Sequence, residues 1–334
     1  MFIDIILQMK QGLKKLILPL NILLFLLVGF GVWLETDQLL QDNAINSFNA
    51  DTYATTQSII NSLESQINAL YSARGATTIN APSSVESWDT FVESQFLFER
   101  YPGLVSVNYA VLVQHANLDT FLADANSKYE YLQPITLRPI NNSAVHLITV
   151  LAASKTSRVD ASESIGFDSL ISPVKKYAID KAIQEGLPAM TEPISIRDTG
   201  RLGAEVYLPI YPTVADTDTD LQNVKPVALA SVTFDTQQLI ADSVGKETLP
   251  NVKLEVKDVD SGSTLYANNV DTKSGLEKSY ELEVGFRKWR LDAVTGRYYT
   301  LSFWQRITPI CLALSVVSLM FTGLRAYKRS GATA

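Results

Sequence analysis

The residue best placed to bind a ligand is an aspartate in a turn. Asp168 directly follows Gly166 and Phe167 and precedes Ser172-Pro173, where the sequence predicts that a helix begins. A carboxylate in such a turn commonly caps nearby backbone N–H groups, and it can also hydrogen-bond a bound molecule. The local sequence alone favours the cap and leaves the ligand role open.

Other residues that could do chemistry are few. Asp216, Asp218 and Asp220 alternate in an acidic loop, but the glycine and the later glutamate of an EF-hand calcium loop are absent. The chain has two histidines and one cysteine, Cys311, which disfavours a metal cluster, a histidine-dependent triad or a cysteine-rich zinc site. It has no phosphate-binding glycine loop, nucleophile elbow or zinc-protease motif. We therefore expect neither an enzyme nor a bound metal or cofactor.

The composition excludes further classes of protein. The chain has 334 residues, of which 46% are hydrophobic and 19% charged, enough for one large domain or two ordinary ones. Its formal net charge is −7, and basic residues cluster only near the chain ends. Nucleic acid is therefore not an expected partner, because binding it requires a basic surface.

Two apolar runs predict a membrane protein. Leu16 to Leu34 and Ile307 to Leu324 carry no charge, and each is about long enough to cross a bilayer core of roughly 30 Å. Lysines precede the first run and basic residues follow the second, which places both short ends in the cytoplasm. The sequence thus predicts a two-pass protein of the inner (plasma) membrane, with residues 35–306 in the periplasm or outside the cell.

A long helix is predicted to continue the first span. No proline or glycine occurs from Glu35 to Arg74, and Ile60, Leu63, Ile67 and Leu70 recur at the 3-4-3 spacing of a helix-pairing seam. We expect a stalk helix over residues 35–75. Its apolar stripe can pack on its own domain or pair with a second copy, and we expect a homodimer through it.

The rest of the exported part is predicted to be α+β. Strand-like segments are not regularly separated by helices, which favours mostly antiparallel sheets over a doubly wound fold. One of the predicted strands is Ile135 to Pro139. An acidic, polar stretch near residues 215–223 predicts a boundary between two lobes, over residues 76–215 and 216–300. The expected cytoplasmic tails are residues 1–15 and 325–334.

Several segments resemble one family when taken together. In order along the chain, the segments that carry the resemblance are Phe96 to Ala110, Ile165 to Asp168 with Ser172-Pro173, Leu208 to Tyr211, and Val256 to Asp258 with Leu265-Tyr266. These segments resemble CHASE domains, the extracytoplasmic sensor modules of many histidine kinases, diguanylate cyclases and plant cytokinin receptors. The resemblance runs from about residue 88 to residue 266.

The resemblance implies two transmembrane helices that flank a long stalk helix and two PAS-like lobes, with the ligand in the membrane-distal lobe, residues 76–215. In the plant receptors an aspartate in the place of Asp168 hydrogen-bonds a purine, so a purine-like ligand is one expectation. Loss of such a bond would weaken binding about 10- to 100-fold. Positions like Met190 and Thr199 also contact the ligand there, and further candidates lie in or beside the matched segments. The expected ligand-binding residues are Asp168, Met190, Thr199, Phe167, Tyr109 and Tyr207.

Two departures from the family shape the functional hypothesis. Ala228 and Ala230 stand where many members have glycine, and only Arg325 to Ala334 follow the second span. We therefore expect a membrane-anchored sensor that binds a small molecule and relays the signal through a partner, such as a histidine kinase or a diguanylate cyclase. The alternative is a module that docks another periplasmic protein and binds no small molecule.

Overall fold

The computed structural model describes most of the chain. Of residues 2–26, 37, 78–79 and 158–160 it describes the backbone alone. The described residues are 2–79, 82, 84–101, 103–129, 131, 133–155, 158–196, 200–212, 225–245, 252–270, 275–295, 303–304, 307–312, 314–316 and 318. The chain forms two compact units, one of Met1–Ala50, Thr272–Leu276 and Thr295–Ala334, and one of Asp51–Asp271 and Glu277–Val294.

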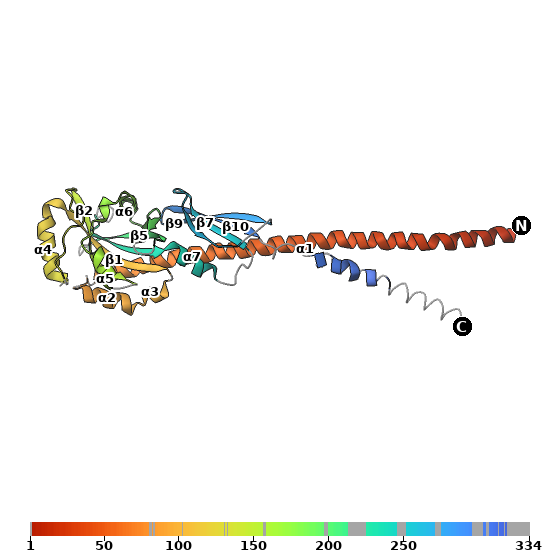
Figure 1. Cartoon of the computed structure of the whole chain (residues 1–334), viewed down its shortest axis with the longest axis horizontal. Helices are drawn as coiled ribbons and strands as arrows, with labels where there is room; N and C mark the ends of the chain where they lie inside the picture. Colours follow the sequence, from red (N-terminus) through yellow and green to blue (C-terminus); the bar gives the residue numbers. More distant parts are fainter. Residues whose placement is uncertain are drawn as a thin grey trace, which may run out of the picture. The chain divides into compact units, whose positions relative to one another are not determined.

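One helix, α1, runs over Phe2–Ile79 and confirms the long N-terminal helix (Figure 1). Its part in the second unit buries Ile59, Leu63 and Leu70. The Ser58 hydroxyl donates to the backbone oxygen of Ser243 in α7 at 2.8 Å. These residues therefore pack on their own domain, whereas Ile60 and Ile67 of the predicted seam are only half-buried, and pairing of α1 with a second copy stays a prediction.

The larger sheet is antiparallel and six-stranded. Its strands are β1 (Leu104–Gln114), β2 (Val145–Ser154), β3 (Ala189–Met190), β4 (Ile194–Ser195), β5 (Leu202–Ile210) and β6 (Ala228–Asp235). The order is β2-β1-β6-β5-β3, with β4 also paired to β5. The expected lobe boundary at residue 215 falls before β6, yet β6 lies at the centre of this sheet. The acidic stretch thus joins two neighbouring antiparallel strands, and the larger sheet extends to Asp235.

Helices cover both faces of this sheet. They are α2 (Val85–Ser94), α3 (Leu97–Arg100), α4 (Leu118–Tyr129), α5 (Arg158–Ser164), α6 (Pro173–Glu185), α7 (Thr236–Val244) and the short η1 (His115–Asn117) and η2 (Ser169–Ile171). On one face, the buried indole of Trp88 in α2 donates to the Val107 carbonyl. On the other, α6 packs Ala178, Ile179 and Ala182 on Tyr207. Because successive side chains of a strand point to opposite faces, neighbouring residues of β1 face different helices.

Local signals explain the position of α6. It begins with Pro173, whose missing N–H costs nothing in a first turn, and it ends at Gly186, which takes the left-handed conformation at φ 69°. These signals fix which residues of α6 face the sheet.

A smaller antiparallel sheet completes the second unit. Its strands are β7 (Val252–Asp258), β8 (Thr264–Ala267), β9 (Glu277–Val284) and β10 (Arg287–Thr295), in the order β8-β7-β10-β9. Gly285 and Phe286 form the turn between β9 and β10, and both have positive φ. The turn of this hairpin meets β3, because the Met190 amide donates to the Gly285 carbonyl at 2.9 Å.

One predicted strand does not form. The segment Ile135 to Pro139 makes an isolated bridge from Arg138 to Phe167 and joins no sheet. The Arg138 amide donates to the Gly166 carbonyl at 2.8 Å, and the Asp168 amide donates to the Arg138 carbonyl at 2.8 Å. Its backbone groups are therefore used by the turn that contains Asp168.

Several predictions fall on residues that the structure does not describe. Within its described part, no helix meets the length and hydropathy that a membrane crossing requires. The two predicted spans, residues 16–34 and 307–324, lie partly outside the described side chains. Thr199 and the three aspartates Asp216, Asp218 and Asp220 lie wholly outside the description.

Candidate ligand-binding site

Asp168 is buried and fully engaged by protein donors. Its Oδ1 accepts from the backbone amides of Leu147 (3.0 Å) and Leu170 (3.1 Å). Its Oδ2 accepts from Asn141 Nδ2 at 3.2 Å and lies 2.8 Å from Nδ1 of His146. The bond from Leu170 caps η2 and confirms the capping interpretation. No surface of Asp168 is exposed, so this carboxylate holds η2 against β2.

A glycine is required for this turn. Gly166 has φ +83°, and a Cβ there would lie 2.4 Å from the Thr136 carbonyl oxygen. The turn also pairs with β2, because the Thr149 amide donates to the Phe167 carbonyl at 3.1 Å. The turn therefore holds Phe167 and Asp168 beside the larger sheet.

The two histidines extend the Asp168 network to the surface. His146 is buried, and its Nε2 lies 3.0 Å from Nδ1 of the exposed His115. In the neutral tautomer that donates from Nδ1 to the Asp168 carboxylate, Nε2 of His146 is the acceptor for His115. Within the described residues, no group of three or more histidine, cysteine or acidic side chains is arranged to hold a metal ion.

A set of buried polar side chains lies on the sheet face beneath α6. It comprises Asn108 of β1, Glu205 and Tyr207 of β5, and Ser231 of β6, and we call it the polar sheet cluster. The register places Ser231 opposite both Asn108 and Tyr207. Asn108 Nδ2 donates to Ser231 Oγ at 3.4 Å, and Ser231 Oγ donates to Glu205 Oε1 at 2.8 Å. The hydrogen bonds therefore run from β1 across β6 towards the Glu205 carboxylate.

A lysine from α6 closes the cluster. Lys175 Nζ lies 2.8 Å from Glu205 Oε2, and 5.3 Å from the centre of the Phe167 ring. The side chain of Glu205 is 4% exposed and that of Lys175 is 24% exposed. Lys175 is thus the member of this group that reaches solvent, and it supplies the charge that a buried carboxylate needs.

The cluster leaves a buried acceptor unused. Asn108 Oδ1 is buried and has no hydrogen-bond partner among the described residues. The Tyr207 hydroxyl also forms no hydrogen bond of ordinary geometry with the described residues, although the side chains of Ser169 and Glu205 affect its pKa. Burial, with a smaller contribution from the Glu205 charge, raises the pKa of Tyr207 well above its usual value. Because buried polar atoms in folded proteins are almost always paired, these atoms mark a place where a bound molecule can supply the partner.

The sequence-predicted residues divide between the two faces of the sheet. Tyr207 belongs to the polar sheet cluster, Phe167 lies under Lys175, and Met190 is buried in β3. Tyr109 points to the opposite face, where its ring centre lies 6.4 Å from that of Trp88. Burial, with a smaller effect of Tyr129, raises the pKa of Tyr109 to about 12.

Sequence reasoning missed Asn108, Lys175, Glu205 and Ser231. A signal was present in the strands, since Glu205 is the one charged residue in the otherwise apolar run of β5. A charge in a fully buried strand is costly unless it is paired, so it marks a site with a partner. Nothing local to the sequence identifies Lys175 as that partner.

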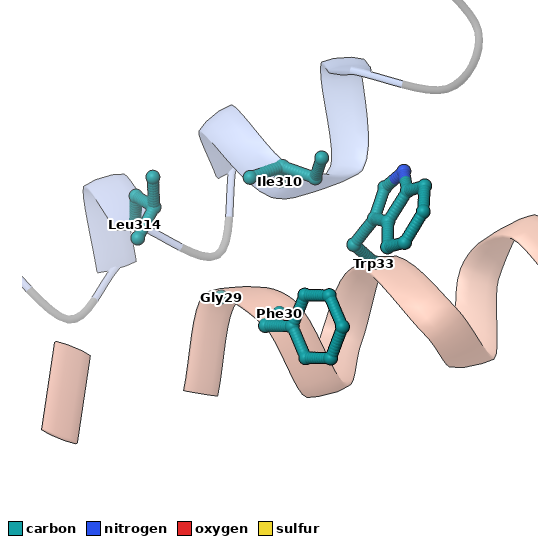
Figure 2. Close-up of a pocket in the computed structure, with 5 residues that line it drawn as sticks. All are labelled: Gly29, Phe30, Trp33, Ile310 and Leu314. Carbon is teal, nitrogen blue, oxygen red and sulfur yellow. The ribbon is translucent and has the colours of Figure 1, made fainter. Parts of the chain in front are cut away.

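A different hollow lies in the first unit (Figure 2). Gly29, Phe30 and Trp33 of α1 line one side, and Ile310 and Leu314 line the other. A Cβ on Gly29 would lie 3.1 Å from Leu314 Cδ2, so the absence of a side chain permits this close contact. The lining is apolar apart from one indole nitrogen. It therefore fits helix packing and not the recognition of a polar ligand.

Comparisons with known proteins identify a family. The sequence profile of the CHASE domain matches residues 83–266, more than half of the chain. A comparison with curated protein sequences finds no match. One similar solved structure is the ligand-binding domain of the Pseudomonas fluorescens chemoreceptor CtaA in complex with L-leucine, at 13% identity, 79% coverage of this chain, 100% coverage of that chain and a TM-score of 0.45.

Two further structures are similar. The ligand-binding domain of the Pseudomonas aeruginosa PAO1 amino acid chemoreceptor PctC, in complex with GABA, has 12% identity, with 75% of this chain and 98% of that chain covered and a TM-score of 0.42. An extracellular ligand binding receptor from Desulfohalobium retbaense has 13% identity and a TM-score of 0.38, over 78% of this chain. The present chain spans 40% of the length of that receptor.

Proposed function

Because the chain belongs to the CHASE domain family, we propose that it is a membrane-anchored sensor that binds a small molecule at the polar sheet cluster. One observation carries the site. Asn108 Oδ1 is buried without a partner among the described residues, and Ser231 links its side chain to a buried carboxylate, Glu205, on the same sheet face beneath α6. A buried acceptor without a partner costs free energy, and a ligand that hydrogen-bonds there recovers it.

The residues around the cluster have distinct roles in this proposal. Glu205 and Asn108 bind the polar part of the ligand, Tyr207 adds a hydroxyl, and Phe167 supplies an aromatic wall. Asp168 holds η2, and therefore the start of α6, over the cluster through its four donors. Purines remain candidate ligands because the exocyclic amines and ring N–H groups of such molecules can donate to these acceptors.

The proposed topology follows from the sequence. Leu16 to Leu34 and Ile307 to Leu324 span the inner membrane, both termini are cytoplasmic, and residues 35–306 lie outside. A homodimer through α1 and a partner histidine kinase or diguanylate cyclase complete the proposal. The apolar runs, the flanking basic residues and the family's usual transmitters support this part.

A contact route leads from the cluster to the smaller sheet. The apolar face of α6 packs on Ala189 of β3, and the next residue, Met190, donates to Gly285 at the β9–β10 turn. Lys181 of α6 also lies 5.0 Å from the centre of the Phe286 ring in that turn. In sequence, β10 is followed by the second apolar run. A ligand that favours one position of α6 can thus bias the hairpin, provided that it binds the two states with different affinity.

A thermal-shift screen of the full chain in detergent tests the proposal. The panel contains purines, amino acids and organic acids, and the proteins are the wild type, Glu205→Gln and the surface control Asp180→Asn. A ligand at 100 times its Kd stabilises the protein by about 2.7 kcal/mol. We expect a shift in the wild type and the control that Glu205→Gln loses. A shift that survives in Glu205→Gln would remove the site from the cluster. No shift in any panel member, together with capture of a periplasmic protein, would favour the docking function instead.

A further inference from the structure

We infer that the ligand of this site carries a primary ammonium or amidinium group, and that Lys175 is a built-in competitor for the position of that group. The inference rests on the proposed site and adds the chemical class of its ligand. It follows from the charge, the hydrogen-bond inventory and the shape of the contacts around Glu205.

The charge argument concerns the Glu205 carboxylate. Glu205 is almost fully buried, and the Lys175 ammonium lies 2.8 Å from its carboxylate. A buried carboxylate without a cation costs several kcal/mol. A neutral or anionic ligand that displaced Lys175 would leave this charge uncompensated. A ligand cation that takes the place of Lys175 keeps the pair intact.

The hydrogen-bond inventory points the same way. Ser231 uses its one proton towards Glu205, so its oxygen must accept from the Asn108 amide nitrogen. With its amide nitrogen turned to Ser231, the side chain of Asn108 points its carbonyl oxygen away from Ser231, where this acceptor has no partner among the described residues. Of the two unpartnered groups of the cluster, the Asn108 carbonyl oxygen can only accept and the Tyr207 hydroxyl can accept as well as donate, so a ligand that donates suits both. An ammonium has three donors and no acceptor, so it can pair with the Glu205 carboxylate and still donate to a further acceptor of the cluster.

The aromatic wall is also suited to a cation. Lys175 Nζ lies 5.3 Å from the centre of the Phe167 ring, within the range of a cation–π contact. A carboxylate on one side and an aromatic face on the other form a cage for an organic cation, and the lysine already occupies it. If a ligand ammonium replaces that of Lys175, the charge and the hydrogen-bond donors next to Glu205 and Phe167 stay the same.

Lys175 can leave this cage at low cost. About a quarter of its side chain is already exposed, whereas Glu205 is buried. Lys175 is the third residue of α6, so its release removes one contact between the first turn of that helix and the sheet. Binding of the ligand cation is thereby coupled to α6, which packs on β3.

Titration calorimetry on the full chain in detergent, at constant ionic strength, tests this inference. The cationic probes are n-butylammonium, putrescine and acetamidinium, and the matched neutral probes are n-butanol and acetamide. Acetate and succinate serve as anions. The proteins are the wild type, Lys175→Met and Lys176→Met, whose lysine is the next residue and pairs with the surface residue Asp180.

We expect the cations to bind and their neutral counterparts not to bind. Removal of the competitor in Lys175→Met should tighten cation binding about tenfold or more, while Lys176→Met should equal the wild type. If Lys175→Met does not fold, Lys175→Arg serves instead, because a bidentate guanidinium holds Glu205 more firmly and should weaken cation binding.

Three results would overturn the inference. The first is binding of neutral or anionic probes in preference to cations. The second is weaker cation binding in Lys175→Met, which would mean that the lysine touches the ligand. The third is an equal effect of Lys176→Met. If a purine or an organic acid shifts the stability through Glu205 while no cation binds, the sensor proposal stands and the ligand class is wrong.

Discussion

Replacing Asp168 with alanine removes the group on which four hydrogen-bond donors converge. Two are the backbone amides of Leu147 and Leu170, and two are the side chains of Asn141 and His146. The aspartate has no exposed surface, so water does not reach the donors from its side. Asp168→Ala should therefore destabilise the fold and release η2 from β2.

The size of the effect follows from these bonds. A buried donor left without a partner costs about 1–3 kcal/mol, and loss of a helix cap costs about 0.5–2 kcal/mol. Such losses are not additive, because the turn relaxes, and we expect about 3–5 kcal/mol in total. Asp168→Asn keeps an acceptor for both backbone amides and turns an amide nitrogen towards His146. Its expected loss is about 1–3 kcal/mol.

Urea unfolding of the full chain in detergent, followed by tryptophan fluorescence, measures both losses. The control is Asp180→Ala, which removes a half-exposed carboxylate paired with Lys176 and should cost less than about 0.5 kcal/mol. A loss below about 1 kcal/mol in Asp168→Ala would refute the reasoning, since it would mean that the four donors find other partners. Asp168→Asn also separates the structural role of this residue from a role in ligand binding. If the variant keeps most of its stability but binds the ligand 10- to 100-fold more weakly, Asp168 touches the ligand.

Three further predictions test other parts of the second unit. Arg287→Met leaves the buried carboxylate of Asp258 in β7 without its cation, and it should lower the free energy of unfolding in urea by about 3–5 kcal/mol. The control, Arg290→Met, removes a half-exposed arginine and should cost less than about 0.5 kcal/mol. Equal losses in the two variants would contradict this prediction. Burial raises the pKa of Tyr109 to about 12, so the stabilisation that its neutral hydroxyl gives the fold is complete below pH 10 and falls by about 3 kcal/mol as the pH rises to about 12. Tyr109→Phe should remove that component and one late step in the phenolate absorbance, and an unchanged titration would count against it. Gly285 has φ +58°, and a Cβ there would lie 3.0 Å from β3, whereas Gly262 has φ +68° and open space around it. Gly285→Ala should therefore lower Tm more than Gly262→Ala. The reverse order would count against the packing of Gly285 on β3.

The sequence predicted the elements that depend on local signals. The start of α6 was predicted from Ser172-Pro173, and the stalk helix from the absence of proline and glycine over Glu35 to Arg74. The segment Ile135 to Pro139 has a strand-like composition, but its backbone bonds are taken by the Gly166 turn. Composition does not reveal such competition, since it depends on which distant segment the fold places beside these residues.

The candidate site depended on strand order, which the sequence did not provide. Asn108 and Ser231 are 123 residues apart, and they meet because β6 lies between β1 and β5. The acidic stretch before β6 was interpreted as a lobe boundary, and this separated the two residues in the prediction. The Asp168 turn was predicted as a local cap because all the information for a cap lies within a few residues. A cluster built by four elements leaves only a weak local trace, the single charge in β5.

The position of α6 gives the cluster a physical means of reporting its occupant. Lys175 lies in the first turn of this helix and Lys181 lies six residues further on, which is about 9 Å along the axis. The first contacts Glu205 and the second lies over Phe286 at the β9–β10 turn. Between them, Ala178 and Ile179 pack on the sheet and keep the helix rigid. Because packed helices shift as units, a change of partner at Glu205 is transmitted to the contacts at the far end of α6. Such a shift requires two states of similar free energy. Competition between Lys175 and the ligand for the Glu205 carboxylate supplies them, since this carboxylate is then paired with a cation both with and without ligand.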